Sequence, residues 1–127
     1  MKKEIGISET EWSVMEVLWE SAPKTIGEIR EALKESGWSD STIKTLVRRL
    51  VGKGAVRIDD SGEQFKYFPA IDEKKCKMKE TKSMIERLYH GSVKMMMASL
   101  ASESSLSDDD VSKLMELIEK MDDKEEA

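Results

Sequence analysis

WSDSTIKTLVRRL, residues 38–50, is the stretch of sequence that decides the fold. Its apolar residues, continued by Val51, recur at the spacing of one helix face: Ile43, Leu46, Val47, Leu50 and Val51. Ser39 is suited to cap the N-terminus of a helix, and Asp40 places a carboxylate in the first turn, where the helix dipole favours negative charge. The sequence therefore predicts an amphipathic helix over residues 39–53.

The opposite face of this helix combines short hydroxyl groups with long cationic side chains: Ser41, Thr42, Lys44, Thr45, Arg48 and Arg49. This combination suits contacts with phosphates and base edges in a DNA groove. An ordinary solvated helix face has a similar composition, so the helix alone does not decide between the two. The neighbouring segments do.

Two helices are predicted before residue 38. A Ser-x-x-Glu capping box at Ser8 opens a helix over residues 8–22, and a Thr-x-x-Glu box at Thr25 opens the next. Pro23 ends the first helix, and Gly37 is a natural end for the second. A helix, a short turn and another helix are the elements of a helix-turn-helix.

A β-hairpin is predicted after the helix. Residues 55–58 and 63–68 have the composition of short strands, and the turn between them contains glycine. The order of elements predicts a winged helix-turn-helix, mainly α with a small β-hairpin wing over residues 55–68. We expect this DNA-binding domain to span residues 1–70. A winged-helix module that binds only protein is the alternative.

The distribution of charge is compatible with DNA binding. The 127-residue chain has a net charge of −5, which by itself argues mildly against a nucleic-acid partner. However, five cations and no carboxylate lie between Lys44 and Ile58, whereas the acidic excess lies near the C-terminus. The basic stretch can therefore face DNA while the acidic end stays away from it.

Residues 71–127 are predicted to form a helical dimerisation domain. A long helical stretch runs to about Ala101 with a break at Gly91, and Ser107 caps a last helix. Two amphipathic helices on a short tail cannot bury their apolar faces against each other, and a symmetric homodimer is the simplest way to cover them. The residues expected at the interface are Leu88, Met96, Leu100, Leu114, Leu117, Ile118 and Met121.

No catalytic site, cofactor or metal site is expected. Cys76 and His90 lie nearly four turns apart on a predicted helix, too far to chelate one ion within a chain. No phosphate-binding loop is present, and no nucleophile stands beside a base. The sequence contains no long apolar run and no apolar signal segment, so we expect a cytoplasmic protein without a membrane partner.

These features together resemble the BlaI/MecI penicillinase-repressor family of winged-helix transcriptional repressors. The resemblance covers nearly the whole chain. It rests on Ser8-x-x-Glu11 through Trp19, Trp38-Ser39-x-x-Thr42-Ile43-x-Thr45 with Arg49-Leu50, Lys53-Gly54-Ala55, Phe65-x-Tyr67-x-Pro69-x-Ile71, Tyr89-x-Gly91 and Leu106-Ser107.

The resemblance implies a cytoplasmic homodimer that binds a pseudo-palindromic, double-stranded DNA operator and blocks transcription. The base contacts would then fall to Ser41, Thr42, Thr45 and Arg49, because hydroxyl and methyl groups can read base edges and arginine can pair with guanine. Lys44, Arg48 and the wing residue Lys66 would contact phosphates or flanking DNA.

The sequence departs from the family at two places. The antibiotic-responsive members are inactivated by proteolysis at an Asn-Phe bond, and Ser99-Leu100 stands at the matching position here. Either a regulatory protease of different specificity acts, or the chain is not induced by cleavage. Copper-responsive relatives carry paired Cys-x-Cys motifs, which this chain lacks. A regulator that responds to an unidentified ligand or metal stays open as an alternative.

Overall fold

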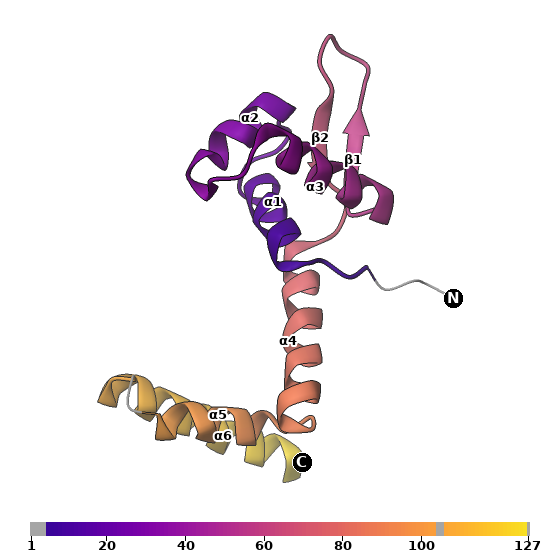
Figure 1. Cartoon of the computed structure of the whole chain (residues 1–127). Coiled ribbons are helices and arrows are strands. Elements are labelled where there is room, and N and C mark those ends of the chain that lie inside the picture. Colours follow the sequence, from indigo (N-terminus) through magenta and orange to yellow (C-terminus); the bar gives the residue numbers. More distant parts are fainter. Residues whose placement is uncertain (1–4, 104–105, 127) are drawn as a thin grey trace. The chain divides into compact units, whose positions relative to one another are not determined.

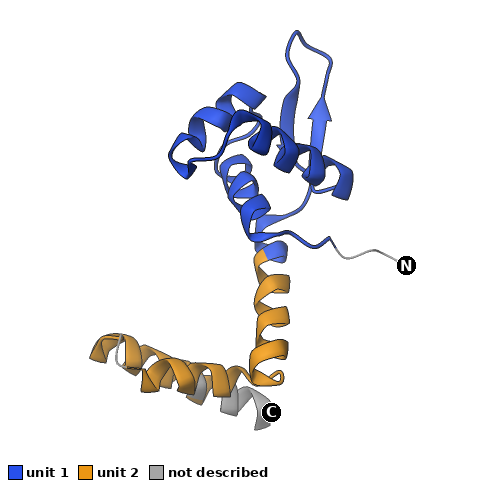
Figure 2. Cartoon of the chain, viewed as in Figure 1, with its two compact units in different colours: residues 1–76 blue, residues 77–127 orange. Residues whose placement is uncertain are grey.

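The protein consists of two compact units, residues 1–76 and 77–127 (Figure 2). The computed structural model describes residues 5–103 and 106–126, apart from the side chains of Ile118 and of residues 121–126. The described elements are mainly helical and include one two-stranded antiparallel sheet, as the sequence predicts. The two units are divided after Cys76, whereas the sequence predicts a boundary after residue 70. The roles expected for residues 1–70 and 71–127 stay predictions.

The first unit contains the predicted helices and hairpin in the predicted order (Figure 1). Its elements are α1 (Glu9–Glu20), α2 (Ile26–Ala32), the 3-10 helix η1 (Lys34–Ser36), α3 (Asp40–Lys53), β1 (Val56–Asp59) and β2 (Lys66–Pro69). This order is that of a winged helix-turn-helix.

Both predicted capping boxes form. Ser8 Oγ accepts from the backbone N–H of Glu11 at 3.2 Å, and Glu11 Oε1 accepts from the backbone N–H of Ser8 at 2.8 Å. Thr25 and Glu28 make the same reciprocal pair. Each box satisfies two N–H groups that a helix start would otherwise leave unpaired.

The turn before α3 differs from the prediction. Gly37 was expected to end the second helix, but α2 already ends at Ala32 and the chain tightens into η1. Ser36 stabilises this tighter turn, because its hydroxyl donates to the carbonyl of Leu33 at 2.6 Å. Gly37, with φ +81°, then ends η1 in the left-handed region that glycine tolerates.

The apolar face of α3 forms the centre of the core. Its buried side chains pack with α1, α2 and the start of the wing; the whole cluster is Val14, Met15, Leu18, Ile29, Ile43, Leu46, Val47, Leu50, Ala55 and Val56. Burial of each large apolar side chain is worth about 1.5–3 kcal/mol, so this contact fixes the direction of α3. Its polar face consequently points to solvent.

The wing is a short hairpin with defined register. Val56 pairs with Pro69, Arg57 with Phe68, Ile58 with Tyr67, and Asp59 with Lys66. The second strand begins at Lys66 rather than at residue 63. Lys24, just before α2, exchanges two backbone hydrogen bonds with Tyr67 and so holds the base of the wing against the helices.

The second unit is helical. Helix α4 (Glu73–Tyr89) begins in the first unit and continues into the second, where α5 (Val93–Ser102) packs with α6 (Asp108–Glu126). The break predicted at Gly91 is present: His90 has φ 51°, Gly91 has φ 84°, and Ser92 caps α5. Ser107 caps α6 by accepting from the N–H of Asp110 at 3.1 Å. Within the described residues, no helix is long and apolar enough to cross a membrane.

An ion pair between the buried Glu11 and the exposed Lys53 joins the start of α1 to the end of α3. The side chain of Glu11 is 1% exposed, and its carboxylate accepts from Lys53 Nζ, which also donates to the carbonyl of Gly6 at 2.8 Å. Burial alone would raise the pKa of Glu11, but the hydrogen bonds from Lys53 and Ser8 outweigh it and hold the pKa below its usual 4.5. The ionised carboxylate therefore stabilises the folded unit.

We expect Lys53→Met to lower the free energy of unfolding by roughly 1–3 kcal/mol at pH 7, because it leaves the buried Glu11 carboxylate without its cation. Since the folded-state pKa is lowered, the pair's contribution is present above pH 4.5 and is lost as the pH falls through the folded-state pKa of Glu11. Urea unfolding at several pH values measures both effects. An unchanged difference between wild type and variant down to pH 3 would contradict this account.

Candidate nucleic-acid interface

The polar face of α3 is a continuous exposed surface. All seven side chains predicted to contact DNA are exposed: Ser41, Thr42, Lys44, Thr45, Arg48, Arg49 and Lys66. Six of them lie on α3 and share the side opposite the core, whereas Lys66 begins β2 in the wing. The structure thus makes all seven accessible to a partner.

A cluster of hydroxyl groups forms the N-terminal end of this surface. Ser39 Oγ accepts from the backbone N–H of Thr42 at 3.2 Å and donates to Thr42 Oγ1 at 3.0 Å. Ser41 Oγ lies 3.1 Å from Ser39 Oγ. Ser39 was predicted as a helix cap only; here it also orients two of the hydroxyl groups predicted to read bases.

The hydroxyl group of Thr45 has a restricted role. It donates to the carbonyl of Ser41, one turn earlier, at 2.9 Å. With its proton engaged in this way, Thr45 offers a partner an acceptor oxygen and a methyl group. A methyl group can contact the C5-methyl of thymine, and an acceptor oxygen can accept a hydrogen bond from the amino group of adenine or cytosine.

An ion pair between α2 and α3 neutralises the one acidic side chain at this end of α3. Arg30 Nη1 donates to Asp40 Oδ2 at 2.9 Å. Without this partner, the Asp40 carboxylate would repel DNA phosphates from the N-terminus of α3. The sequence predicts Asp40 in the first turn of the helix, but it did not lead us to Arg30 as its partner. The opposite charges of the two residues, on neighbouring helices of a helix-turn-helix, could have indicated this ion pair.

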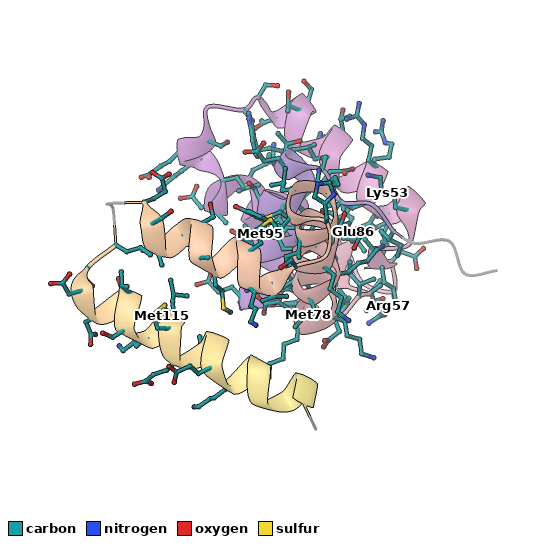
Figure 3. All side chains as sticks on the ribbon, turned by 90° about the horizontal axis from the view of Figure 1, so that it is seen from below. Lys53, Arg57, Met78, Glu86, Met95 and Met115 are labelled. Atoms are coloured by element: carbon teal, nitrogen blue, oxygen red, sulfur yellow. The ribbon has the colours of Figure 1, made fainter. Side chains whose placement is uncertain are left out.

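Two of the five cations between Lys44 and Ile58 have intramolecular partners. Lys53 is bound to Glu11, and the Arg57 guanidinium lies 4.4 Å from the centre of the Phe68 ring; Figure 3 labels both cations. Arg57 and Phe68 are cross-strand neighbours, so this cation–π contact holds the arginine along the wing. Lys44, Arg48 and Arg49 are the cations that α3 presents to solvent without an ion pair among the described residues.

The tip of the wing carries opposite charges. Asp59 Oδ1 accepts from the hydroxyl of Ser61 at 2.6 Å and from its backbone N–H at 3.0 Å, and these bonds hold the pKa of Asp59 below its usual value. Asp59 is the cross-strand partner of Lys66. The carboxylate therefore offsets part of the positive charge that Lys66 would offer a phosphate.

No metal-binding cluster accompanies this surface. Within the described residues, no group of three or more histidine, cysteine, aspartate or glutamate side chains is placed to hold an ion. What the surface presents is hydroxyl, methyl and guanidinium groups on a rigid helix, with a hairpin beside it. The hydroxyl and guanidinium groups can form hydrogen bonds with base edges and phosphates, and the methyl groups can make apolar contact with thymine.

Comparison with known proteins shows which family shares this architecture. A family model described as penicillinase repressor matches residues 7–120. The chain is 34% identical over 120 residues to the penicillinase repressor of Bacillus licheniformis, covering 94% of each. It is 29% identical over 119 residues to the methicillin resistance regulatory protein MecI of Staphylococcus aureus strain N315, covering 93% of this chain and 97% of that protein.

A solved structure extends the comparison. The solution structure of monomeric Bacillus licheniformis BlaI in complex with the blaP half-operator matches with a TM-score of 0.51 and 39% identity, covering 58% of this chain and 92% of that one. The winged-helix architecture predicted from the sequence is therefore confirmed.

Ser39→Ala is expected to lower the free energy of unfolding of the first unit by about 1 kcal/mol, because the cap of α3 is lost. Ser39→Asp is the matched control, since aspartate caps a helix equally well. Denaturant unfolding followed by tryptophan fluorescence gives the comparison. Equal stability of the alanine and aspartate variants would show that the cap does not hold the start of α3.

Proposed function

The chain belongs to the penicillinase repressor family, and we propose that it is a homodimeric transcriptional repressor of a pseudo-palindromic operator. It is a DNA-binding regulator and not an enzyme, because its relatives are repressors and regulatory proteins. The structure of one of them was solved in complex with a half-operator. The observation that carries the proposal is the exposed polar face of α3, whose opposite face is buried in the core. This arrangement presents the helix to a DNA major groove.

We propose that α3 reads bases with Ser41, Thr42, Thr45 and Arg49. The hydroxyl and methyl groups of the first three can discriminate base edges, and the guanidinium group of Arg49 can pair with guanine. Lys44, Arg48 and Lys66 contact phosphates, which adds affinity that falls as salt concentration rises. Asp59 is the cross-strand partner of Lys66 and offsets part of its charge. Lys44 and Arg48 therefore contribute more to DNA affinity than Lys66 does.

The second unit supplies dimerisation in this proposal. Leu88 is 62% exposed, Leu117 is 46% exposed, and Leu100 is also exposed, so the chain by itself leaves large apolar side chains in water. Met78, Met95 and Met115, which Figure 3 labels, are exposed as well. Met96 and Leu114 are half-buried, whereas the side chains of Ile118 and Met121 lie outside the described residues. A second copy of the chain covers these groups symmetrically.

The mechanism is steric. A dimer places two α3 helices on half-sites about one helical turn apart, and the occupied operator excludes RNA polymerase. Each half-site contact is weak, and dimerisation converts the second contact into an intramolecular one at high effective concentration. Residues 1–70 thus bind DNA, residues 71–127 join the two chains, and the protein acts in the cytoplasm.

Inactivation by a regulatory protease would require unwinding of α5. The Ser99–Leu100 bond lies within α5, which runs to Ser102, and Ser99 is half-buried. A peptide bond in a hydrogen-bonded helix must open locally before a protease can bind it in an extended form. Covering of α5 by a partner chain would raise the cost of that opening.

Arg49→Ala is expected to weaken operator binding by roughly 1–3 kcal/mol and to relax sequence preference at one position of each half-site. Lys44→Ala should instead weaken binding to all sequences alike and make it less sensitive to salt. Fluorescence anisotropy with DNA from upstream of the gene measures both. Absence of any specific binding by the folded wild-type protein would favour a module that binds only protein.

Leu117→Asp is expected to shift the protein from dimer to monomer, with the dimer dissociation constant raised more than tenfold, because about 1.5–3 kcal/mol of apolar burial is lost in each chain. Ser112→Asp is the matched control, since it adds the same charge to an exposed position of α6 on the side away from the apolar stripe. Sedimentation equilibrium gives the mass. Dimers of equal strength in both variants would exclude α6 from the interface.

A further inference from the structure

A groove separates α3 from the wing. Its volume is about 310 Å³, which lies at the lower end of the range for small-molecule sites. Its apolar lining comes from Val47 and Val51 of α3, from Ile26 at the start of α2, and from the wing. The groove lies wholly within the first unit, and two of the side chains proposed to contact DNA, Lys44 and Arg48, are part of its lining.

The wing wall leaves apolar surface exposed to water. Ile58 is 37% exposed and Phe65 is 54% exposed, and Tyr67 lies beside them along the groove. Phe65 precedes β2 and contributes nothing to the buried cluster of the first unit. Large apolar side chains left in water around a concave surface are a feature of ligand grooves and interaction sites.

The groove also carries positive charge. Lys44 and Arg48 lie one helical turn apart on α3, and both line the groove. The residues that line it, all of them in the described part of the chain, include no carboxylate. Neither cation makes an ion pair among the described residues. An apolar slot with two unpaired cations at its side complements an apolar molecule that carries one negative group.

We propose that this groove binds a small amphipathic carboxylate, with an aromatic or branched apolar body between α3 and the wing and its carboxylate on Lys44 and Arg48. An inorganic anion would use the cations and leave the apolar walls in water. A neutral apolar molecule would leave the cations without a partner. The combination of walls and charges selects a ligand that has both parts.

Such a ligand competes with DNA. In the proposed function, which this step rests on, Lys44 and Arg48 contact operator phosphates. A bound carboxylate neutralises these two cations and fills the space between α3 and the wing. Operator affinity therefore falls when the groove is occupied, so that the groove couples a metabolite to repression within the DNA-binding unit itself.

The test uses 3-phenylpropionate as the probe and the full-length protein without DNA. Methyl NMR and isothermal titration calorimetry should give saturable binding with a dissociation constant of ~1 mM, as expected for so small a ligand. Shifts should concentrate on the methyl groups of Val47, Val51 and Ile58. The neutral 3-phenylpropionamide and inorganic phosphate should bind at least several-fold more weakly.

Adjacent arginines provide the matched variants. Arg48→Gln should weaken binding of 3-phenylpropionate about three- to fivefold, as for an exposed ion pair. Arg49→Gln removes the same charge from the next residue, outside the groove, and should leave binding unchanged. Phe65→Ala removes an exposed wall without touching the core and should also weaken binding. Equal binding of the amide, equal effects of the two arginine variants, or no saturable binding would each overturn the proposal.

A separate measurement tests the link to repression. Addition of 3-phenylpropionate should lower operator affinity in the anisotropy assay, and the amide should not. Binding in the groove with no effect on operator affinity would overturn the competition. Because the first titrations contain no DNA, they test the site even where the protein binds no operator.

Discussion

Burial of the apolar face of α3 is the contact on which the remaining structure depends. Ile43, Leu46, Val47 and Leu50 are buried among α1, α2 and β1, so the helix cannot rotate without exposing them. The direction in which the polar face points is therefore determined by the packing of the core and not by the composition of that face. An ion pair also holds each end of α3: Asp40 at its start pairs with Arg30, and Lys53 at its end pairs with Glu11. A binding helix held in this way loses little conformational entropy when it meets DNA.

The sequence predicted the fold well because its local signals agree with its long-range pattern. The capping boxes at Ser8 and Thr25, the break at Gly91 and the cap at Ser107 all follow from short-range chemistry, and all are present. The end of the second helix was predicted too late, because a 3-10 turn before a left-handed glycine uses the same residues as a helix that continues to it.

The candidate site was only partly predictable, because its supporting contacts join residues far apart in the sequence. Lys53 was one of five cations in a basic stretch, and nothing local indicated that it would be bound to Glu11. The partner of Asp40 and the placement of Arg57 over Phe68 likewise depend on tertiary structure. Helical periodicity placed Ser41, Thr42, Thr45 and Arg49 on the polar face of the helix, and the family resemblance implied that they contact bases. The restricted hydrogen bonding of Thr45 could be seen only in the side-chain geometry.

The proposed homodimer carries two rigid α3 helices, and it therefore requires an operator with two-fold symmetry. Selection from a random DNA library with the full-length protein tests it most directly. We predict an enriched motif made of two inverted half-sites whose centres lie about one helical turn apart. Enrichment of a single unpaired site, or of no sequence at all, would contradict it.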